Sequence, residues 1–204
     1  MKRPGLRRPG SKGPRRTAPE AGSGAAPEVT QEAFRQAAGR FATGIAIVTA
    51  RSDGIDHAMT ANAFTSVSLD PLLALVCVER DARFHDAVVG AGAWAVSVLP
   101  ASAHEASVWF ATRGRPLENQ LENYPHVRGD RTGAAILEDA LAFVECQTIA
   151  VHPGGDHSIV VGEVRSVGTP NPEAGPLVYF RGSYRSLEVA GDRGSVSCRG
   201  GDPD

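Results

Sequence analysis

The chain has 204 residues, of which 42% are hydrophobic and 22% are charged, and its formal net charge is −2. This composition supplies enough apolar material for one hydrophobic core, so a single folded domain is expected. The first 16 residues hold seven of the 21 basic residues and no acidic residue, which leaves 14 basic against 23 acidic residues in the remainder. An acidic body of this kind excludes an extended basic surface for nucleic acid.

The cysteines and the hydropathy pattern bound the compartment. Cys77, Cys146 and Cys198 are an odd number without close pairs, which favours neither a disulfide framework nor a zinc knuckle. No run approaches the roughly 20 apolar residues of a membrane span, and the N-terminal segment lacks the apolar stretch of a signal peptide. We therefore expect a soluble, cytoplasmic protein that does not contact a membrane.

Both ends of the chain differ in composition from its middle. Residues 1–29 are rich in Pro, Gly, Ala, Ser and Arg and have no aromatic residue, so they cannot bury enough surface to offset the entropy of ordering. Residues 190–204 follow the same logic. We predict a disordered basic N-terminal tail over 1–29, one folded domain over 30–189 and a disordered C-terminal tail over 190–204.

The middle of the chain begins with a predicted short helix and continues mainly as strands. Thr30 can cap the helix, and Phe34 and Phe41 follow on one side. Runs rich in β-branched or aromatic residues and bounded by Gly, Pro and Asp then predict strands. These runs are 45–50, 59–68, 72–79, 93–99, 143–152, 157–167 and 177–187.

Turns between these runs predict antiparallel pairing. LDPL joins the second and third runs, and PGGD joins the fifth and sixth. Residues 81–92 and 102–112 are predicted to form short helices, whereas 114–133 is too polar and irregular to place. A mainly β, antiparallel barrel with a few short peripheral helices is the expected fold class.

The stretch MTANAFTSVSLD, from Met59 to Asp70, has two unlike faces when it is read as one strand. The face expected in the core carries Met59, Ala61, Ala63, Thr65, Val67 and Leu69. The other face lacks long charged side chains and carries Thr60, Asn62, Phe64, Ser66 and Ser68. Short hydroxyl and amide groups would let a flat polar ligand lie against this face. Spacing alone, however, favours a covering strand or loop.

Six segments, taken together, resemble a known family. ATGIAIVTA, MTANAFTSVSLDPLLALVCV, WAVSVL, WFAT, GGDHSIVVGEV and PLVYFRGSY occur in the order and spacing of the short-chain flavin reductases of the FMN-binding split-barrel fold. The resemblance covers about residues 32–188. Members of this family use NADH or NADPH to reduce free FMN or FAD, which passes to a separate monooxygenase. The resemblance implies an antiparallel split β-barrel and a homodimer.

By this resemblance, a flavin covers the polar face. Its ring would meet Thr60 to Ala63, and Ser66 and Ser68 would lie toward the ribityl phosphate. Hydride transfer to flavin N5 leaves negative charge near N1 and O2, which fixed N–H and hydroxyl dipoles stabilise. The resemblance also places the end of the run 72–79 beside the ribityl chain. The flavin-binding residues it implies on the runs 59–68 and 72–79 are Thr60, Ala61, Asn62, Ala63, Phe64, Ser66, Val67, Ser68, Cys77 and Val78.

The region near the phosphate departs from the family pattern. Family members often have Ser or Thr there, but this chain has Ala82 and Phe84. The departure leaves Arg83, together with the start of the following helix, as the expected phosphate contact.

The segment HPGGDH implies a second site. The Gly-Asp-His motif of the family places His157 beside the nicotinamide as the catalytic residue, although a histidine with a purely structural role in the turn is an alternative. A metal site at His152, Asp156 and His157 would need a further ligand that is not identifiable, so no metal is expected. Phe110 and Tyr184 are candidates to pack against the edge of the flavin ring or against the nicotinamide, although such aromatic residues more often pack in cores.

These observations predict an NAD(P)H:flavin oxidoreductase that supplies reduced FMN or FAD to a partner monooxygenase. The alternative is a protein of the same fold that binds flavin tightly as a carrier, sensor or oxidase and does not turn over NAD(P)H. A third interpretation makes the basic tail the active part, but the tail has neither an amphipathic nor an aromatic pattern.

Overall fold

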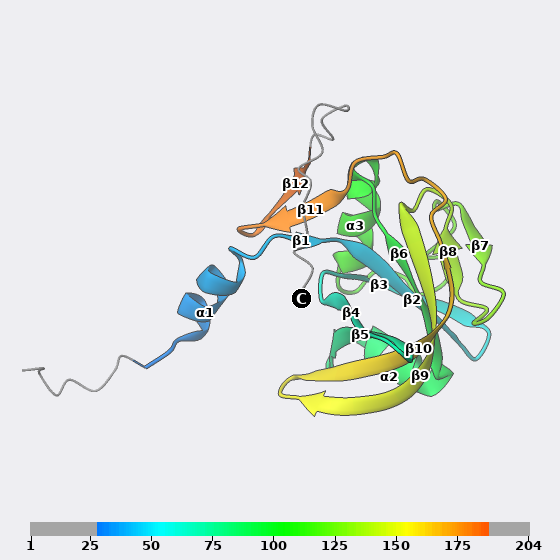
Figure 1. Ribbon diagram of the computed structural model, residues 1–204, viewed down its shortest axis with the longest axis horizontal. Coiled ribbons are helices and arrows are strands. Elements are labelled where there is room, and N and C mark those ends of the chain that lie inside the picture. Colours follow the sequence, from blue (N-terminus) through cyan, green and yellow to red (C-terminus); the bar gives the residue numbers. More distant parts are fainter. Residues whose placement is uncertain (1–27, 188–204) are drawn as a thin grey trace, which may run out of the picture.

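The computed structural model describes residues 28–187 (Figure 1). The predicted tails lie outside these residues except for Glu28 and Val29, and so does Cys198. The described chain is mainly β, with antiparallel sheets and few helices. No helix in this part of the chain is long and apolar enough to cross a membrane.

A seven-stranded antiparallel sheet forms the body, in the order β3-β2-β6-β9-β10-β5-β4. The edge strands β3 and β4 follow one another in the chain and are separated only by Asn62 and Ala63. Because so short a link must reach from one edge to the other, the sheet curves round on itself there. The seven strands are β2 (Ala46–Ser52), β3 (Ile55–Ala61), β4 (Phe64–Leu69), β5 (Leu72–Glu79), β6 (Ala93–Val98), β9 (Ala142–Gly154) and β10 (His157–Gly168).

Two smaller sheets and a helical arm complete this part of the fold. The arm consists of α1 (Gln31–Ala38) and extends away from the body beside the three-stranded sheet (Figure 1). No residue of α1 is buried. The three-stranded sheet has the order β1-β11-β12, and its strands are β1 (Thr43–Gly44), β11 (Leu177–Phe180) and β12 (Ser183–Ser186). The two-stranded sheet pairs β7 (His126–Arg128) with β8 (Ala135–Leu137).

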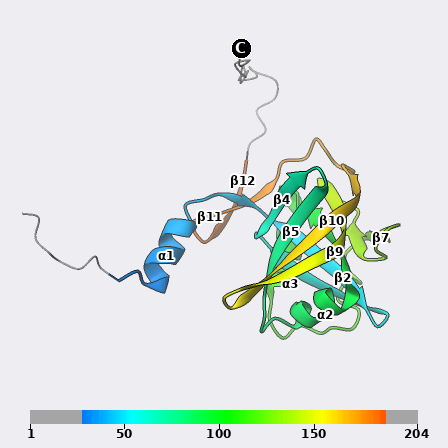
Figure 2. The same cartoon turned by 60° about the horizontal axis from the view of Figure 1, so that its bottom comes forward.

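Strand β2 is buried on both faces and separates two hydrophobic clusters. Val48 packs in a cluster with Trp94, which α2 (Arg83–Ala91) covers through Phe84 and Val88. The position of α2 against the body is visible in Figure 2. Ile47, the neighbour of Val48, packs in the other cluster. That cluster includes residues of the short 3₁₀ turn η1 (Ala101–Ala103) and of α3 (His104–Ala111). Alternation along a strand sends consecutive side chains to opposite faces.

Most predicted elements are confirmed, with boundary shifts of a few residues. Thr30 caps α1, since its hydroxyl accepts a hydrogen bond from Ala33 N at 3.1 Å. Strand β5 spans 72–79 as predicted, and the predicted helices 81–92 and 102–112 contain α2 and α3. The PGGD turn joins β9 to β10, with Gly155 at φ 73°.

The prediction of one strand over 59–68 is wrong. The chain leaves the sheet at Asn62 and Ala63, and β4 then pairs only with β5, with an irregularity between Ser66 and Ser68. The alternation therefore does not carry through, and four residues assigned to the core face are exposed. They are Ala63, Thr65, Val67 and Leu69.

Two hairpins were also missed. The run 177–187 is not one strand, because it turns at Arg181 and Gly182, with φ 52° and 73°. The second hairpin joins β2 to β3 at Asp53 and Gly54, with φ 52° and 78°. Positive φ at both central residues defines the tight hairpin turn that Asp-Gly favours, so this signal was present in the sequence.

Candidate functional site

The break between β3 and β4 leaves backbone donors free. Pairing with β2 ends at Ala61, and pairing of β4 with β5 begins at Phe64. The carbonyl of Ala63 accepts from Cys77 N at 3.0 Å. Within residues 28–187, the N–H groups of Asn62 and Ala63 donate to no protein group, and both residues are exposed. Two such donors at a gap in a sheet suit the carbonyl oxygens of a planar ligand.

A hollow of about 520 Å³ lies beside β3, and we call it the arginine pocket. Three arginines line it together with two carboxylates, Glu79 and Asp81. Strand β3, the turn before α2 and the segment after α3 supply its walls. Its lining residues are His57–Thr60, Glu79, Asp81–Phe84, Phe110–Arg115 and Gln120.

Arg115 is the structural anchor of the arginine pocket. Its side chain is half-buried and donates to the carbonyls of Ala58 and Thr112, the latter at 2.9 Å. Its Nε also donates to Gln120 Oε1 at 3.3 Å, and its guanidinium lies 5.6 Å from the centre of the Phe110 ring. These contacts tie the segment after α3 to strand β3.

The other two arginines that line the arginine pocket come from different parts of the chain. Arg83 begins α2 and donates from Nη1 to the carbonyl of Arg115 at 3.0 Å. Within the described residues, no side chain caps the N-terminus of α2, where Ala82, Arg83 and Phe84 line the pocket. Arg113 lies after α3 and forms an ion pair with Glu79. Both arginines are exposed, so both are accessible to a ligand.

The pKa values of two groups in the arginine pocket report its positive charge. Burial lowers the pKa of His57, and the charge of Arg83 lowers it further. Burial and then Arg83 likewise lower the pKa of Arg115. Burial is the larger cause of both shifts, and only the smaller contribution, from Arg83, reflects positive charge that favours an anion over a further cation.

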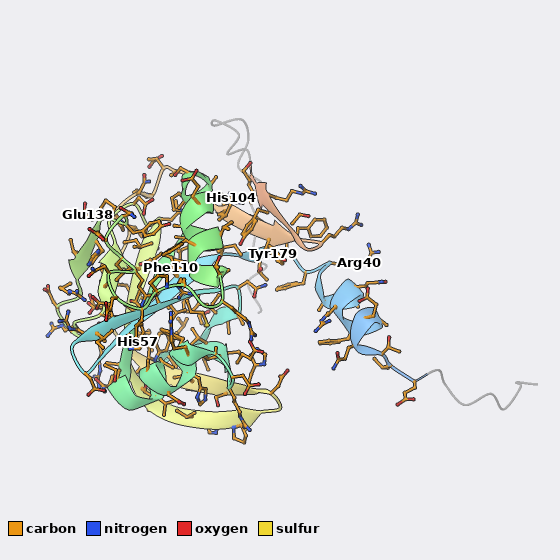
Figure 3. All side chains as sticks on the ribbon, turned by 180° about the vertical axis from the view of Figure 1, so that it is seen from behind. Arg40, His57, His104, Phe110, Glu138 and Tyr179 are labelled. Atoms are coloured by element: carbon orange, nitrogen blue, oxygen red, sulfur yellow. The ribbon has the colours of Figure 1, made fainter. Side chains whose placement is uncertain are left out.

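The predicted residue Thr60 connects this pocket, through Ser107, to the three-stranded sheet that contains β12. Its hydroxyl donates to the carbonyl of Ser107 in α3 at 2.6 Å, and Ser107 Oγ donates to Tyr184 Oη at 3.0 Å. Tyr184 packs edge-on against His104, with ring centres 4.6 Å apart. Figure 3 shows His104 beside the small sheet and away from His57. Tyr184 therefore belongs to the packing between α3 and β12.

The pairing of β10 with β5 brings the Gly-Asp-His turn next to Glu79, which lines the arginine pocket. His157 is directly opposite Glu79 in the pairing of β10 with β5. Its Nδ1 lies 2.7 Å from Asp156 Oδ1, and the hydrogen bond and charge of His157 lower the pKa of Asp156. The carbonyl of Asp156 accepts from Arg80 N at 3.0 Å, which fixes the turn against the end of β5.

Only part of the predicted site meets in one hollow. The arginine pocket brings together Thr60, Arg83 and Phe110, the last with its side chain 1% exposed. Val78 is fully buried and Cys77 is half-buried on β5, while His157 and Tyr184 lie on separate hairpins. The remaining predicted residues lie at the strand break and on its flanks. They are Ala61, Asn62, Ala63, Phe64, Ser66, Val67 and Ser68.

Several residues of the arginine pocket were not predicted from the sequence. His57, Arg113, Arg115 and Gln120 line it, yet none was singled out. The pair Arg113 and Arg115, directly after a predicted helix, was the available signal. In the part of the chain that the structure describes, no group of three or more His, Cys, Asp or Glu residues is placed to hold a metal ion.

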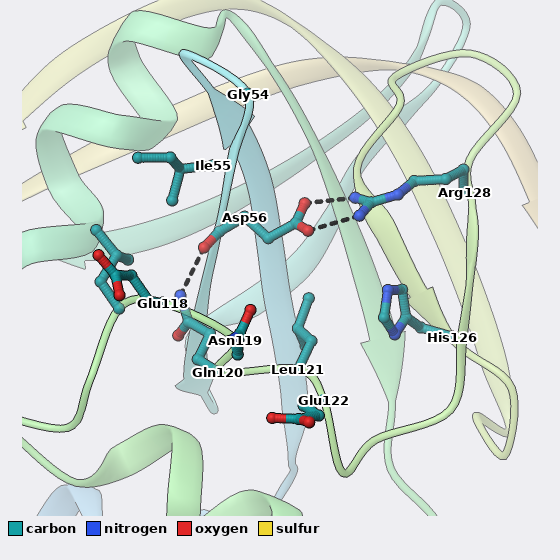
Figure 4. Close-up of a pocket in the computed structure, with 11 residues that line it drawn as sticks. Gly54, Ile55, Asp56, Glu118, Asn119, Gln120, Leu121, Glu122, His126 and Arg128 are labelled. Atoms are coloured by element: carbon teal, nitrogen blue, oxygen red, sulfur yellow. Dashed lines mark hydrogen bonds and ion pairs between the residues drawn. The ribbon is translucent and has the colours of Figure 1, made fainter.

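A second hollow, of about 510 Å³, adjoins the first, and we call it the Asp56 hollow (Figure 4). Both carboxylate oxygens of Asp56 accept from Arg128, and Gln120 Nε2 donates to the Asp56 carbonyl at 2.6 Å. Partial burial raises the pKa of Asp56, but the hydrogen bond and charge of Arg128 outweigh it, so the pKa is lowered. The hollow is lined by Gly54–Asp56, Leu117–Glu122, His126 and Arg128.

Comparison with known proteins identifies a family. Residues 38–188 match the family described as flavin reductase like domain. An NADH-dependent flavin reductase from a Rhodococcus species is 40% identical over 81% of this chain and 91% of its own. The reductase component of 4-hydroxyphenylacetate 3-monooxygenase from Thermus thermophilus is 41% identical over 77% of this chain and 97% of its own.

Solved structures agree with the sequence matches. BorF, the flavin reductase component of a bacterial two-component tryptophan halogenase, has a TM-score of 0.73 and 42% identity, covering 78% of this chain and 98% of its own. The Streptomyces globisporus NADH:FAD oxidoreductase SgcE6, in complex with NAD and FAD fragments, has a TM-score of 0.74 and 34% identity. That match covers 82% of this chain and 100% of the SgcE6 chain.

Proposed function

Because this chain belongs to the flavin reductase-like family, we propose that it uses NADH or NADPH to reduce FMN or FAD and releases the reduced flavin to a partner monooxygenase. Relatives named as NADH-dependent flavin reductases and as monooxygenase reductase components support both halves of the proposal. The same relatives favour turnover over the alternative of a tight flavin carrier.

One observation carries the proposal: the free backbone donors at Asn62 and Ala63 lie two and three residues after Thr60, which lines the arginine pocket. A flavin joins a planar ring with carbonyl oxygens to a chain that ends in phosphate. The free N–H groups of Asn62 and Ala63 suit the carbonyl oxygens of the ring, and the nearby arginine pocket suits the phosphate. When bound, the flavin supplies the hydride-accepting ring, and this chain holds and orients it.

The direct test is NADH consumption with and without added free flavin. We expect oxidation of NADH or NADPH only when FMN or FAD is supplied, because the flavin is substrate as well as cofactor. Absence of turnover with either flavin and either nicotinamide would contradict the proposal. Tight binding of flavin without turnover would support the carrier instead.

A second test separates the ring site from the nicotinamide site. Asn62→Leu adds bulk under the proposed ring and should weaken flavin binding, whereas His157→Ala should leave it nearly unchanged and slow hydride transfer or raise the KM for NAD(P)H. Loss of a contact to one bound group should change the affected binding constant or KM by roughly 5- to 150-fold. Fluorescence titration and stopped-flow reduction of both variants would decide. Loss of flavin binding in His157→Ala would reverse the assignment.

We further propose that the curved sheet is a split β-barrel, that the protein is a homodimer, and that it works in the cytoplasm. The arm and the residues just after it support the dimer, because Phe34 in α1 and Phe41 beyond its end are 66% and 77% exposed, and a second copy would cover them. A monomeric mass by light scattering at micromolar concentration would contradict the dimer.

A further inference from the structure

Arg113 and Glu79 form an ion pair at the rim of the arginine pocket. Glu79 is the last residue of β5, and Arg113 follows α3, so the pair joins two walls of the pocket. The side chains are 75% and 38% exposed for Arg113 and Glu79. An ion pair this exposed contributes little to stability and can be exchanged for another partner.

Arg113 differs from the other arginines of the pocket in what it contacts. Arg115 donates to two carbonyls and to Gln120, and Arg83 donates to a carbonyl. Those partners are neutral. Arg113 alone among the three has a carboxylate partner within residues 28–187. Its charge is therefore already neutralised before a ligand arrives.

We propose that Arg113 exchanges Glu79 for a phosphate group of the flavin, so that Glu79 competes with the flavin for this arginine. The inference rests on the proposed function and adds a residue that sets how tightly the flavin is held. A phosphate offers the guanidinium the same two-point contact as a carboxylate, with more negative charge. The exchange moves no bond and changes only the partner of Arg113.

The exchange gives the protein a means of releasing its product. A reductase that supplies flavin to another protein must bind the flavin well enough to orient it and weakly enough to release it. Glu79 lowers affinity by recapturing Arg113 when the phosphate leaves. It does so without altering contacts to the ring, because its effect passes through the phosphate contact.

The test compares FMN with riboflavin, which has the same ring but no phosphate. Dissociation constants would be measured by fluorescence quenching for wild type, Glu79→Gln, Arg113→Gln and the double variant. We expect Glu79→Gln to tighten FMN binding about five-fold, which corresponds to about 1 kcal/mol. Arg113→Gln should weaken FMN binding about ten-fold. In the Arg113→Gln background, Glu79→Gln should have no further effect, and riboflavin binding should be unchanged throughout.

Asp81→Asn is the matched control, because Asp81 also lines the pocket but forms no ion pair within the described residues. Both acidic substitutions remove one negative charge. Equal tightening of FMN by Asp81→Asn, or by Glu79→Gln in the Arg113→Gln background, would show general repulsion and overturn the exchange. Wild-type protein that binds none of FMN, FAD and riboflavin would instead overturn the proposed function, and the inference with it.

Discussion

The two adjoining hollows are nearly equal in size, about 520 and 510 Å³, but they treat charge in opposite ways. Gln120 lines both, and β3 contributes Asp56 to one and His57 to the other. In the Asp56 hollow, Arg128 is met by both oxygens of a carboxylate. In the arginine pocket, three arginines face two carboxylates, and within residues 28–187 only Arg113 forms an ion pair.

The comparison teaches that volume does not identify a binding site in this protein. A cation held by both oxygens of a carboxylate that is only 21% exposed, as Arg128 is by Asp56, holds the fold together and offers little to a ligand. A cation that bonds only neutral carbonyls, as Arg83 does, keeps its charge available, and one in an exposed ion pair, as Arg113 is with Glu79, can exchange its partner. On this distinction we propose that the Asp56 hollow serves stability and that the arginine pocket binds the ligand, and each proposal can be tested separately.

The largest effect on stability is expected at Arg115, where one substitution should affect both stability and ligand binding and so break the contrast between the two hollows. Arg115 lines the arginine pocket but also holds Gln120, which lines both hollows. Arg115→Met should lower the free energy of unfolding by about 2 kcal/mol, because several hydrogen bonds from a half-buried cation are lost. FMN affinity should fall as well. Urea denaturation and FMN titration would measure both, with the exposed neighbour Arg113→Gln as the control that keeps its stability within about 0.5 kcal/mol.

A smaller effect, on stability alone, is expected at Asp56. Asp56→Asn should lower the free energy of unfolding by about 1 kcal/mol and leave FMN affinity unchanged. Because the pKa of Asp56 is lowered in the folded state, its contribution is present above the unfolded pKa of about 3.9 and is lost as pH falls through the folded value. The difference between wild type and variant should therefore vanish in acid. A difference that persists at low pH would contradict this reasoning.

The smallest effect is a change in the titration of His57. Burial and Arg83 lower its pKa, so the unfolded chain takes up this proton first and stability falls as pH drops below about 6.5. Arg83→Gln should raise the pKa of His57, and FMN should raise it too by offsetting the positive charge. NMR titration of the imidazole would show both shifts. An unchanged pKa in Arg83→Gln would mean that Arg83 does not act on this histidine.

The parts of the fold that sequence predicted are those with local signals. Strand 72–79 and the PGGD hairpin were predicted because alternation and turn residues act over a few positions. The break at Asn62 and Ala63 was not, because it arises where the two edges of one curved sheet are joined, and no local propensity encodes that link.

The site shows the same division. Thr60 was named from the family resemblance, Arg83 because the chain departs from the family pattern near the phosphate, and Phe110 as a candidate aromatic platform. The structure places all three around the arginine pocket. His57 and Arg115 were missed, because their roles depend on contacts between segments far apart in the chain, such as Arg115 with Ala58. A segment that looks polar and irregular in sequence, 114–133, supplies part of both hollows.

The most direct test of the contrast between the hollows is one pair of matched substitutions, Arg83→Gln and Arg128→Gln. Each removes one guanidinium, and FMN affinity would be measured by calorimetry well below the unfolding temperature of each variant. We predict that Arg83→Gln weakens FMN binding about ten-fold, or about 1.4 kcal/mol, and that Arg128→Gln changes it less than about two-fold. Equal weakening by both substitutions, or weakening by Arg128→Gln alone, would contradict the assignment of the flavin phosphate to the arginine pocket.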